Sequence, residues 1–113
     1  MENRNKRRGV TIVKICSVKT AQERVEKFKI ETQEKYKDMV YRNIERLSLQ
    51  GYQHYVIDIE LKFNDIQKSF ITPDFTLAFR RELEDQGYVT LESSCGIITV
   101  YWGGEEYNQT YKK

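Results

Sequence analysis

The chain has 113 residues, of which 39% are hydrophobic and 32% are charged, and its formal net charge is +2. This length is typical of one domain with its own hydrophobic core, and the composition excludes an intrinsically disordered chain. The uncharged apolar runs are far shorter than the roughly 20 residues needed to cross a bilayer. Because no apolar segment typical of a secretory signal follows the basic start, we expect a cytoplasmic protein without membrane association.

The two cysteines, Cys16 and Cys95, lie far apart, and neither belongs to a CxxC or Cys/His motif. The chain has a single histidine, which excludes sites built from several histidines. We therefore expect no metal site and no cofactor. Two reduced thiols are favoured in a chain without an export signal, although the spacing leaves a disulfide open.

Residues 1–9 carry four basic side chains and one acidic side chain, so we expect a basic arm in front of a single domain formed by residues 10–102. One interpretation is a solvated terminus. The other is an arm that contacts phosphate groups or an acidic partner. Under the second interpretation Arg7 and Arg8 are candidate binding residues.

The domain is predicted to open with a strand. Residues 10–18, VTIVKICSV, are rich in β-branched side chains and carry one charge, which is typical of a strand buried on much of both faces. Thr20 and Glu23 then stand at the spacing of a capping box, so a helix is expected to begin there.

The helix is expected to cover residues 21–49, because apolar residues recur every three or four positions and Gly51 supplies a left-handed stop. Such a helix would be about 43 Å long, so it must overhang a compact domain or bend. The apolar stripe is weakest at residues 30–37, where we expect any kink. We expect the stripe to cover the protein's own sheet, with a partner or second subunit as the alternative.

Residues 52–63 are predicted to form a strand, since HYVIDIELKF at 54–63 alternates between polar and apolar side chains. The apolar face is expected in the core. The other face, which carries His54 and Asp58, is expected to meet solvent, a second subunit or a ligand. A turn at residues 64–65 and a connector at residues 66–71 follow.

A second helix is predicted to begin at Thr72, Pro73 and Asp74, which supply a cap, a first-turn proline and an acidic first turn, and to end at Gly87. Two short strands, residues 88–93 and 97–102, are then expected to form a hairpin. The order is β-α-β-α-β-β. We therefore predict an α/β (α+β) two-layer sandwich, with two helices on one face of a four-stranded mixed sheet and a C-terminal hairpin.

Residues 103–113 are expected to form a flexible aromatic tail. Tyrosine and tryptophan suit both protein interfaces and stacking on a nucleobase, although many of them also fill cores and sheet edges. The candidate ligand-binding or partner-binding residues are Arg7, Arg8, His54, Asp58, Tyr101, Trp102, Tyr107 and Tyr111.

No pattern predicts a catalytic site. Asp58 and Glu60 would lie about 7 Å apart on one strand face, a spacing open to paired-carboxylate chemistry or a hard cation but typical of ordinary surface charges. Cys95 lies in a turn beside small polar residues, and the lone histidine, His54, is the one candidate base. We therefore expect a protein that is not an enzyme.

Within residues 74–102, the run LAFRRELEDQGYVTLESSCGIITVYW combines a helix, Gly-Tyr, a short strand, a small turn and a strand with an aromatic end. This pattern resembles the C-terminal part of small accessory proteins of tailed bacteriophages that counteract their hosts. The resemblance implies a non-enzymatic binding protein in the cytoplasm of a bacterial host. It implies sequestration or inhibition of a host protein or a nucleotide immune signal, and it transfers no functional residue.

Two kinds of partner follow from these patterns. We expect a homo-oligomer that assembles through the long helix or the open sheet face and binds a host protein or a nucleotide-type molecule. The alternative is a single-stranded nucleic-acid-binding protein that uses the open sheet face and the basic arm. Asp58 and Glu60 on that face, together with the lack of RNP-type aromatic motifs, argue against the alternative.

Overall fold

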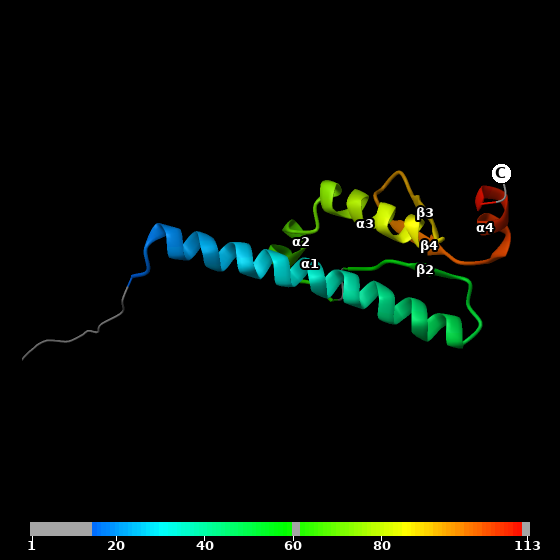
Figure 1. Cartoon of the computed structure of the whole chain (residues 1–113), viewed down its shortest axis with the longest axis horizontal. Coiled ribbons are helices and arrows are strands. Elements are labelled where there is room, and N and C mark those ends of the chain that lie inside the picture. The colour runs from blue at the N-terminus through cyan, green and yellow to red at the C-terminus, as the bar shows by residue number, and fades with distance from the viewer. Residues whose placement is uncertain (1–14, 60–61, 112–113) are drawn as a thin grey trace, which may run out of the picture.

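The computed structural model describes residues 15–59 and 62–111 as an α+β fold (Figure 1). Four helices and three strands lie in this part of the chain. In chain order they are α1 (Val18–Leu49), β2 (His54–Val56), α2 (Asp65–Ser69), α3 (Pro73–Asp85), β3 (Val89–Glu92), β4 (Ile98–Tyr101) and α4 (Gly104–Tyr111).

The sheet has three strands in the order β2-β4-β3, and both hydrogen-bonded pairs are antiparallel. The predicted sandwich of two helices on a four-stranded mixed sheet is therefore wrong, because the described residues form four helices and a three-stranded antiparallel sheet. The strands β2 and β3, which α2 and α3 connect, do run in the same direction because each is antiparallel to β4. The last strand inserts between them, so the expected parallel pair never forms its hydrogen bonds.

The first two predicted strands, at residues 10–18 and 52–63, also differ from the structure. Residues 10–14 of the first lie outside the described residues, residues 15–17 are not a strand, and Val18 already belongs to α1. The strand predicted at residues 52–63 is confined to β2. The Ile57 N–H still bonds to the Ile98 carbonyl at 2.9 Å. Beyond that point β4 gives way to the turn at residues 93–97, so the β2–β4 ladder ends there.

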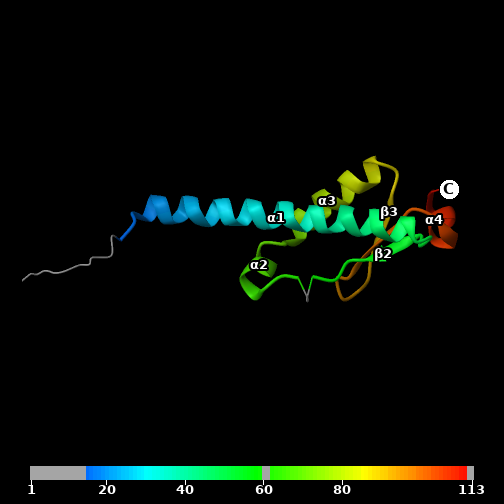
Figure 2. The same cartoon turned by 90° about the horizontal axis from the view of Figure 1, so that it is seen from below.

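Helix α1 begins three residues before the predicted capping box. Ser17 is the N-cap, and its Oγ accepts a hydrogen bond from the Thr20 N–H at 3.1 Å. The helix then continues without interruption through residues 30–37, where Thr32 and Tyr36 are buried. The predicted kink is therefore absent from α1. The predicted overhang is present, because the N-terminal half of α1 projects beyond the other elements in both views (Figures 1 and 2).

The predictions for the second half of the domain are confirmed in their local detail. Thr72 caps α3 through a 3.1 Å bond from the Phe75 N–H to its hydroxyl, and Pro73 is the first helical residue. Gly87 follows the end of the helix with a φ of 101°, and the hairpin of β3 and β4 forms as expected. The connector instead contains α2, which Asn64 starts with a capping box.

The core lies between one face of the sheet and the helices α1 and α3. Alternation along the strands brings Val100 and Ile98 to this face together with Tyr55 and Ile57. The buried residues that meet there are Tyr36, Val40, Ile44, Ile57, Phe63, Phe79, Leu83, Ile98 and Val100.

The C-terminal segment is not an irregular tail in the structure. Residues Gly104–Tyr111 form α4, which contacts β3 and β4. Gly104 has a φ of 85°, which lets the chain turn out of β4 and enter the helix. Helix α4 covers one end of the sheet face that points away from α1, and for this reason Val89 is buried although its side chain lies on that face.

Candidate functional site

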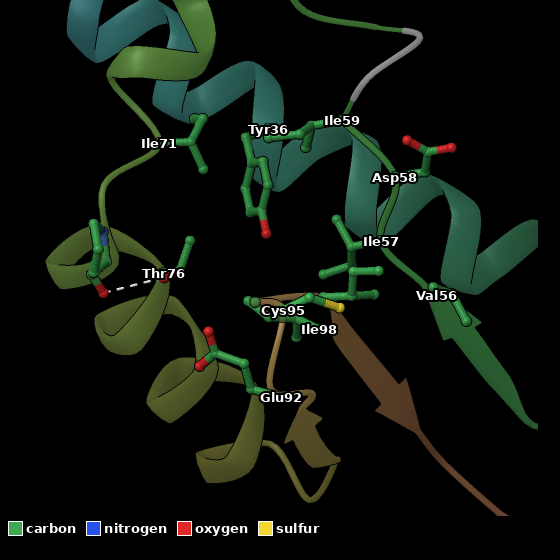
Figure 3. Close-up of a pocket in the computed structure, with 13 residues that line it drawn as sticks. Tyr36, Val56, Ile57, Asp58, Ile59, Ile71, Thr76, Glu92, Cys95 and Ile98 are labelled. Carbon is green, nitrogen blue, oxygen red and sulfur yellow. Dashed lines mark hydrogen bonds between the residues drawn. The ribbon is translucent and has the colours of Figure 1, made fainter.

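An open cavity of about 570 Å³ lies beyond the end of the β2–β4 ladder (Figure 3). Its size is typical of ligand sites. Four parts of the chain enclose it: α1, the segment after β2, the α2–α3 connection with the start of α3, and the turn between β3 and β4. The aliphatic side chains in its walls are Val56, Ile57, Ile59, Ile71, Ile97 and Ile98.

The cavity exists because two segments separate where the sheet ends. Ile57 is still bonded to Ile98, whereas residues 58–59 leave the ladder on one side and the turn before Ile97 leaves it on the other. The turn is fixed by the Ser93 Oγ, which accepts a bond from the Ile97 N–H at 3.1 Å. Gly96 adopts a φ of 86°, which favours glycine at this position.

The hydroxyl of Tyr36 points into this cavity (Figure 3). The side chain is 2% exposed, and three phenylalanine rings hold it with centroids 5.5 to 6.4 Å from its own. Within the described residues no group makes a hydrogen bond with this hydroxyl. Burial raises the pKa of Tyr36, and the nearby Tyr55 and Glu92 raise the pKa further. A buried hydroxyl that faces an open cavity can bond there to water or to a polar group of a bound molecule.

Replacing this tyrosine by phenylalanine tests whether the hydroxyl lacks a partner within the protein. We expect Tyr36→Phe to leave the free energy of unfolding unchanged or to raise it by about 1–2 kcal/mol, because an unsatisfied buried polar group is removed. Tyr55→Phe is the matched control, since the Asn43 Nδ2 donates to the Tyr55 hydroxyl at 3.0 Å. The control should lose about 1 kcal/mol in urea denaturation. An equal loss in both variants would contradict the assignment.

The charges around the cavity are acidic. Asp58 and Glu92 contribute carboxylates to the lining, and no lysine, arginine or histidine is among the lining residues that the structure describes. Glu92 is paired with Arg80 at 3.1 Å, which offsets the charge of its carboxylate. This lining is unsuitable for a phosphate group and suits a neutral or cationic ligand with apolar surface.

A free thiol marks the cavity wall. Cys95 is exposed and lines the cavity, and its Sγ lies 3.1 Å from the Ser93 Oγ. Cys16, just before α1, is exposed as well and lines no part of the cavity. The two thiols therefore form a natural pair of reporters, one at the site and one away from it.

The structure brings two of the predicted site residues together. His54 and Tyr101 are directly paired across β2 and β4, with ring centroids 5.7 Å apart, on the sheet face that points away from α1. Trp102 directly follows β4. Its ring packs edge-on against Tyr88, and its Nε1 donates to the Tyr52 carbonyl at 2.9 Å. This bond ties the end of β4 to the loop before β2.

The remaining predicted residues are dispersed. Arg7 and Arg8 lie outside the described residues, Tyr107 lies on α4 and Tyr111 ends it, and Asp58 alone contributes to the cavity. Sequence reasoning assigned Tyr36 to the buried stripe of the long helix and missed its role at the cavity. The one available signal was a tyrosine, rather than a phenylalanine, at a position in the core.

Other kinds of site receive no support from the geometry. Among residues 15–59 and 62–111, no group of three or more histidine, cysteine or acidic side chains is arranged to hold a metal ion. No helix in that part of the chain combines the length and the apolar character needed to cross a membrane. Comparison of the chain with protein-family models, curated proteins and solved structures gave no match.

Proposed function

We propose that this chain is a non-enzymatic binding protein whose cavity receives a short apolar segment of a partner protein. The observation that carries the proposal is the buried, unpartnered hydroxyl of Tyr36 at the end of a cavity with aliphatic walls. Aliphatic side chains of the partner would fill the walls, and a backbone or side-chain polar group would bond to the hydroxyl. In line with the resemblance of residues 74–102, the partner would be a host protein in the bacterial cytoplasm.

The cavity favours a protein over the nucleotide that the sequence also suggested. A nucleotide needs donors or cations for its phosphates, and the lining instead contributes Asp58 and Glu92. Binding of single-stranded nucleic acid through the sheet would need exposed aromatic rings in a basic groove. That face carries the exposed aliphatic Val56 and Leu91 beside the rings of His54 and Tyr101. Its three strands contain no lysine or arginine, so a protein partner fits both the cavity and this face better.

The test is selection from a library of random peptides on the full chain. We expect the selected peptides to be rich in leucine, isoleucine and valine and poor in acidic residues. A bound peptide should slow the reaction of Cys95 with a maleimide and leave the reaction of Cys16 unchanged, because Cys95 alone lines the cavity. Tyr36→Phe should weaken binding of the same peptides by roughly five-fold, the effect of one lost hydrogen bond of about 1 kcal/mol.

Two results would overturn the proposal. One is a selection that yields no consensus, or peptides that protect neither thiol or both thiols equally. The other is protection of Cys95 by adenosine monophosphate or by a short RNA in place of the peptides, which would assign the cavity to a nucleotide. Tyr55→Phe is the control for Tyr36→Phe, since its hydroxyl is bonded to Asn43 and lines no part of the cavity.

A further inference from the structure

The first half of α1 carries an apolar face that the rest of the chain leaves largely uncovered. We name residues 18–31 the helix overhang, because they precede Thr32, the first buried residue of α1. Its apolar side chains stand three and four positions apart, on the same side of the helix as the buried Tyr36 and Val40. They are Val18, Ala21, Val25 and Phe28. Of these, Phe28 has an edge-on contact with Phe70, while Val25 is 56% exposed.

The sheet has a second uncovered apolar surface, on the face away from α1. The strand register places Val56, Thr99 and Leu91 side by side on that face, and Ile97 lies two residues from Thr99 on the same side. We name these four residues the apolar strip. Val56, Leu91 and Ile97 are each more than 40% exposed. Helix α4 covers the neighbouring row at Val89 and stops short of the strip.

We propose that two copies of this chain form a reversible dimer in which the helix overhang of each copy packs on the apolar strip of the other. A helix laid on a sheet is the ordinary way to bury one apolar face of each. The strip adjoins the cavity, since Val56 and Ile97 belong to both, whereas Val25 and Leu91 line no part of the cavity. Variants at these two residues therefore test the dimer without altering the proposed binding site.

The directions of the two surfaces allow both contacts to form at once. Helix α1 lies over the inner face of its own sheet (Figures 1 and 2). The apolar side of the overhang continues the buried side of α1, so it faces from the helix toward the layer in which the sheet lies. The apolar strip points away from α1, on the outer face. A second copy turned over by a two-fold axis therefore places its overhang on the first strip, and its own strip under the first overhang.

The size of the contact sets the expected strength. Residues 18–31 are about 21 Å long and about 10 Å wide with their side chains, a footprint of roughly 200 Å². Two reciprocal contacts, counted on both copies, cover roughly 800 Å², which is typical of weak and transient interfaces. We therefore expect a dimer whose population depends on concentration.

A direct pairing of two overhangs fits the structure less well. Phe70 lies against Phe28, and its carbonyl accepts a 3.0 Å bond from the Gln33 Nε2, so the connector crosses the apolar face of α1 at that level. An antiparallel pair of overhangs is thereby limited to the turns before Phe28. Such a pair would also bring Arg24 of each copy close to Arg24 of the other, which is repulsive.

Sedimentation velocity over a wide concentration range tests the dimer. We expect the average mass of the full chain to rise from 13.5 kDa toward twice that value. Val25→Glu and Leu91→Glu should each raise the dissociation constant at least about tenfold, since each buries an unpaired charge. Leu77→Glu, outside both surfaces, and Ile30→Glu, on the side of the overhang opposite its apolar stripe, are controls of similar exposure, 45% and 50%. A monomer at all concentrations, or equal effects in controls and test variants, would overturn the proposal.

Cross-linking then identifies which surfaces meet. In a background with Cys16→Ser and Cys95→Ser, a Val25→Cys chain is mixed with a Leu91→Cys chain and treated with a short bis-maleimide. We expect the mixed product to exceed the product from either chain alone by several fold. Predominant linkage within the Val25→Cys chain alone would indicate paired overhangs, and predominant linkage within the Leu91→Cys chain alone would indicate paired sheets. Either result would overturn the proposal.

Discussion

Replacing Phe79 by alanine is expected to lower the free energy of unfolding by about 3–5 kcal/mol, the range measured when buried aromatic side chains are truncated. Phe79 is buried, and its ring has edge-on contacts with Tyr36 and Tyr41 at centroid distances of 5.7 Å and a stacked contact with Phe75 at 6.3 Å. Alanine at position 79 would leave these three rings without the contacts that the Phe79 ring makes. Domains are commonly stable by only about 5–15 kcal/mol, so this one substitution removes a large share of the stability.

Leu77→Ala on the same helix is the control for this prediction, because Leu77 is exposed. Alanine has the highest helix propensity, so neither substitution weakens the helix itself and the difference between them reports packing. Urea denaturation at one fixed low concentration, followed by circular dichroism, gives both values, since self-association would otherwise add to the stability. A loss below about 1 kcal/mol for Phe79→Ala would show that the core is not assembled around this ring.

Local signals in the sequence predicted helix boundaries well where the groups that start or stop the helix lie within a few residues of its end. Thr72, Pro73 and Gly87 set the start and the end of α3 through a side-chain cap, a fixed φ and a left-handed conformation. The same reasoning misplaced the start of α1, because Ser17 and Thr20 both offer a capping side chain and the earlier one extends the helix by three residues.

The sheet could not be predicted in this way, because strand pairing depends on segments far apart in the chain. Alternation correctly indicated that Ile57 would be buried and that His54 would be exposed. It could not show that β4 would lie between β2 and β3, or that the ladder would end at Ile57 for lack of a partner. The cavity arises from that early ending, so it was hidden from the sequence for the same reason.

The central residue of the cavity was hidden for a different reason. A helical stripe shows that Tyr36 faces the core, but a hydroxyl there has a partner or lacks one according to which side chains other segments bring near. Tyr41 and Tyr55 lie on or beside the same core, and both hydroxyls have partners, Glu82 at 2.8 Å and Asn43 at 3.0 Å. The sequence alone gives no means of separating these three tyrosines.

Replacing Arg80 by alanine is expected to lower the free energy of unfolding by about 2 kcal/mol, since three hydrogen bonds with a charged donor are lost together. Its guanidinium donates to the Thr90 Oγ1 at 2.9 Å, to the Thr90 carbonyl at 3.3 Å and to the Glu92 carboxylate at 3.1 Å. The Ser93 N–H bonds to the Ile97 carbonyl, so alternation along the ladder places the Thr90 carbonyl on the outer edge of β3. Arg80 therefore closes that edge.

Two further variants separate the geometry of Arg80 from its charge. Arg81→Ala removes the same charge from the next position, where the side chain is exposed, and should change the stability by no more than about 0.5 kcal/mol. Arg80→Lys keeps the charge but cannot form the planar set of three bonds, and it should lose at least half as much as Arg80→Ala. If Arg80→Lys were as stable as the unmodified protein, Arg80 would contribute only its charge and not its hydrogen-bond geometry. If the geometry matters, Arg80→Ala also exposes the unpaired edge of β3, and light scattering should show faster aggregation than in Arg81→Ala.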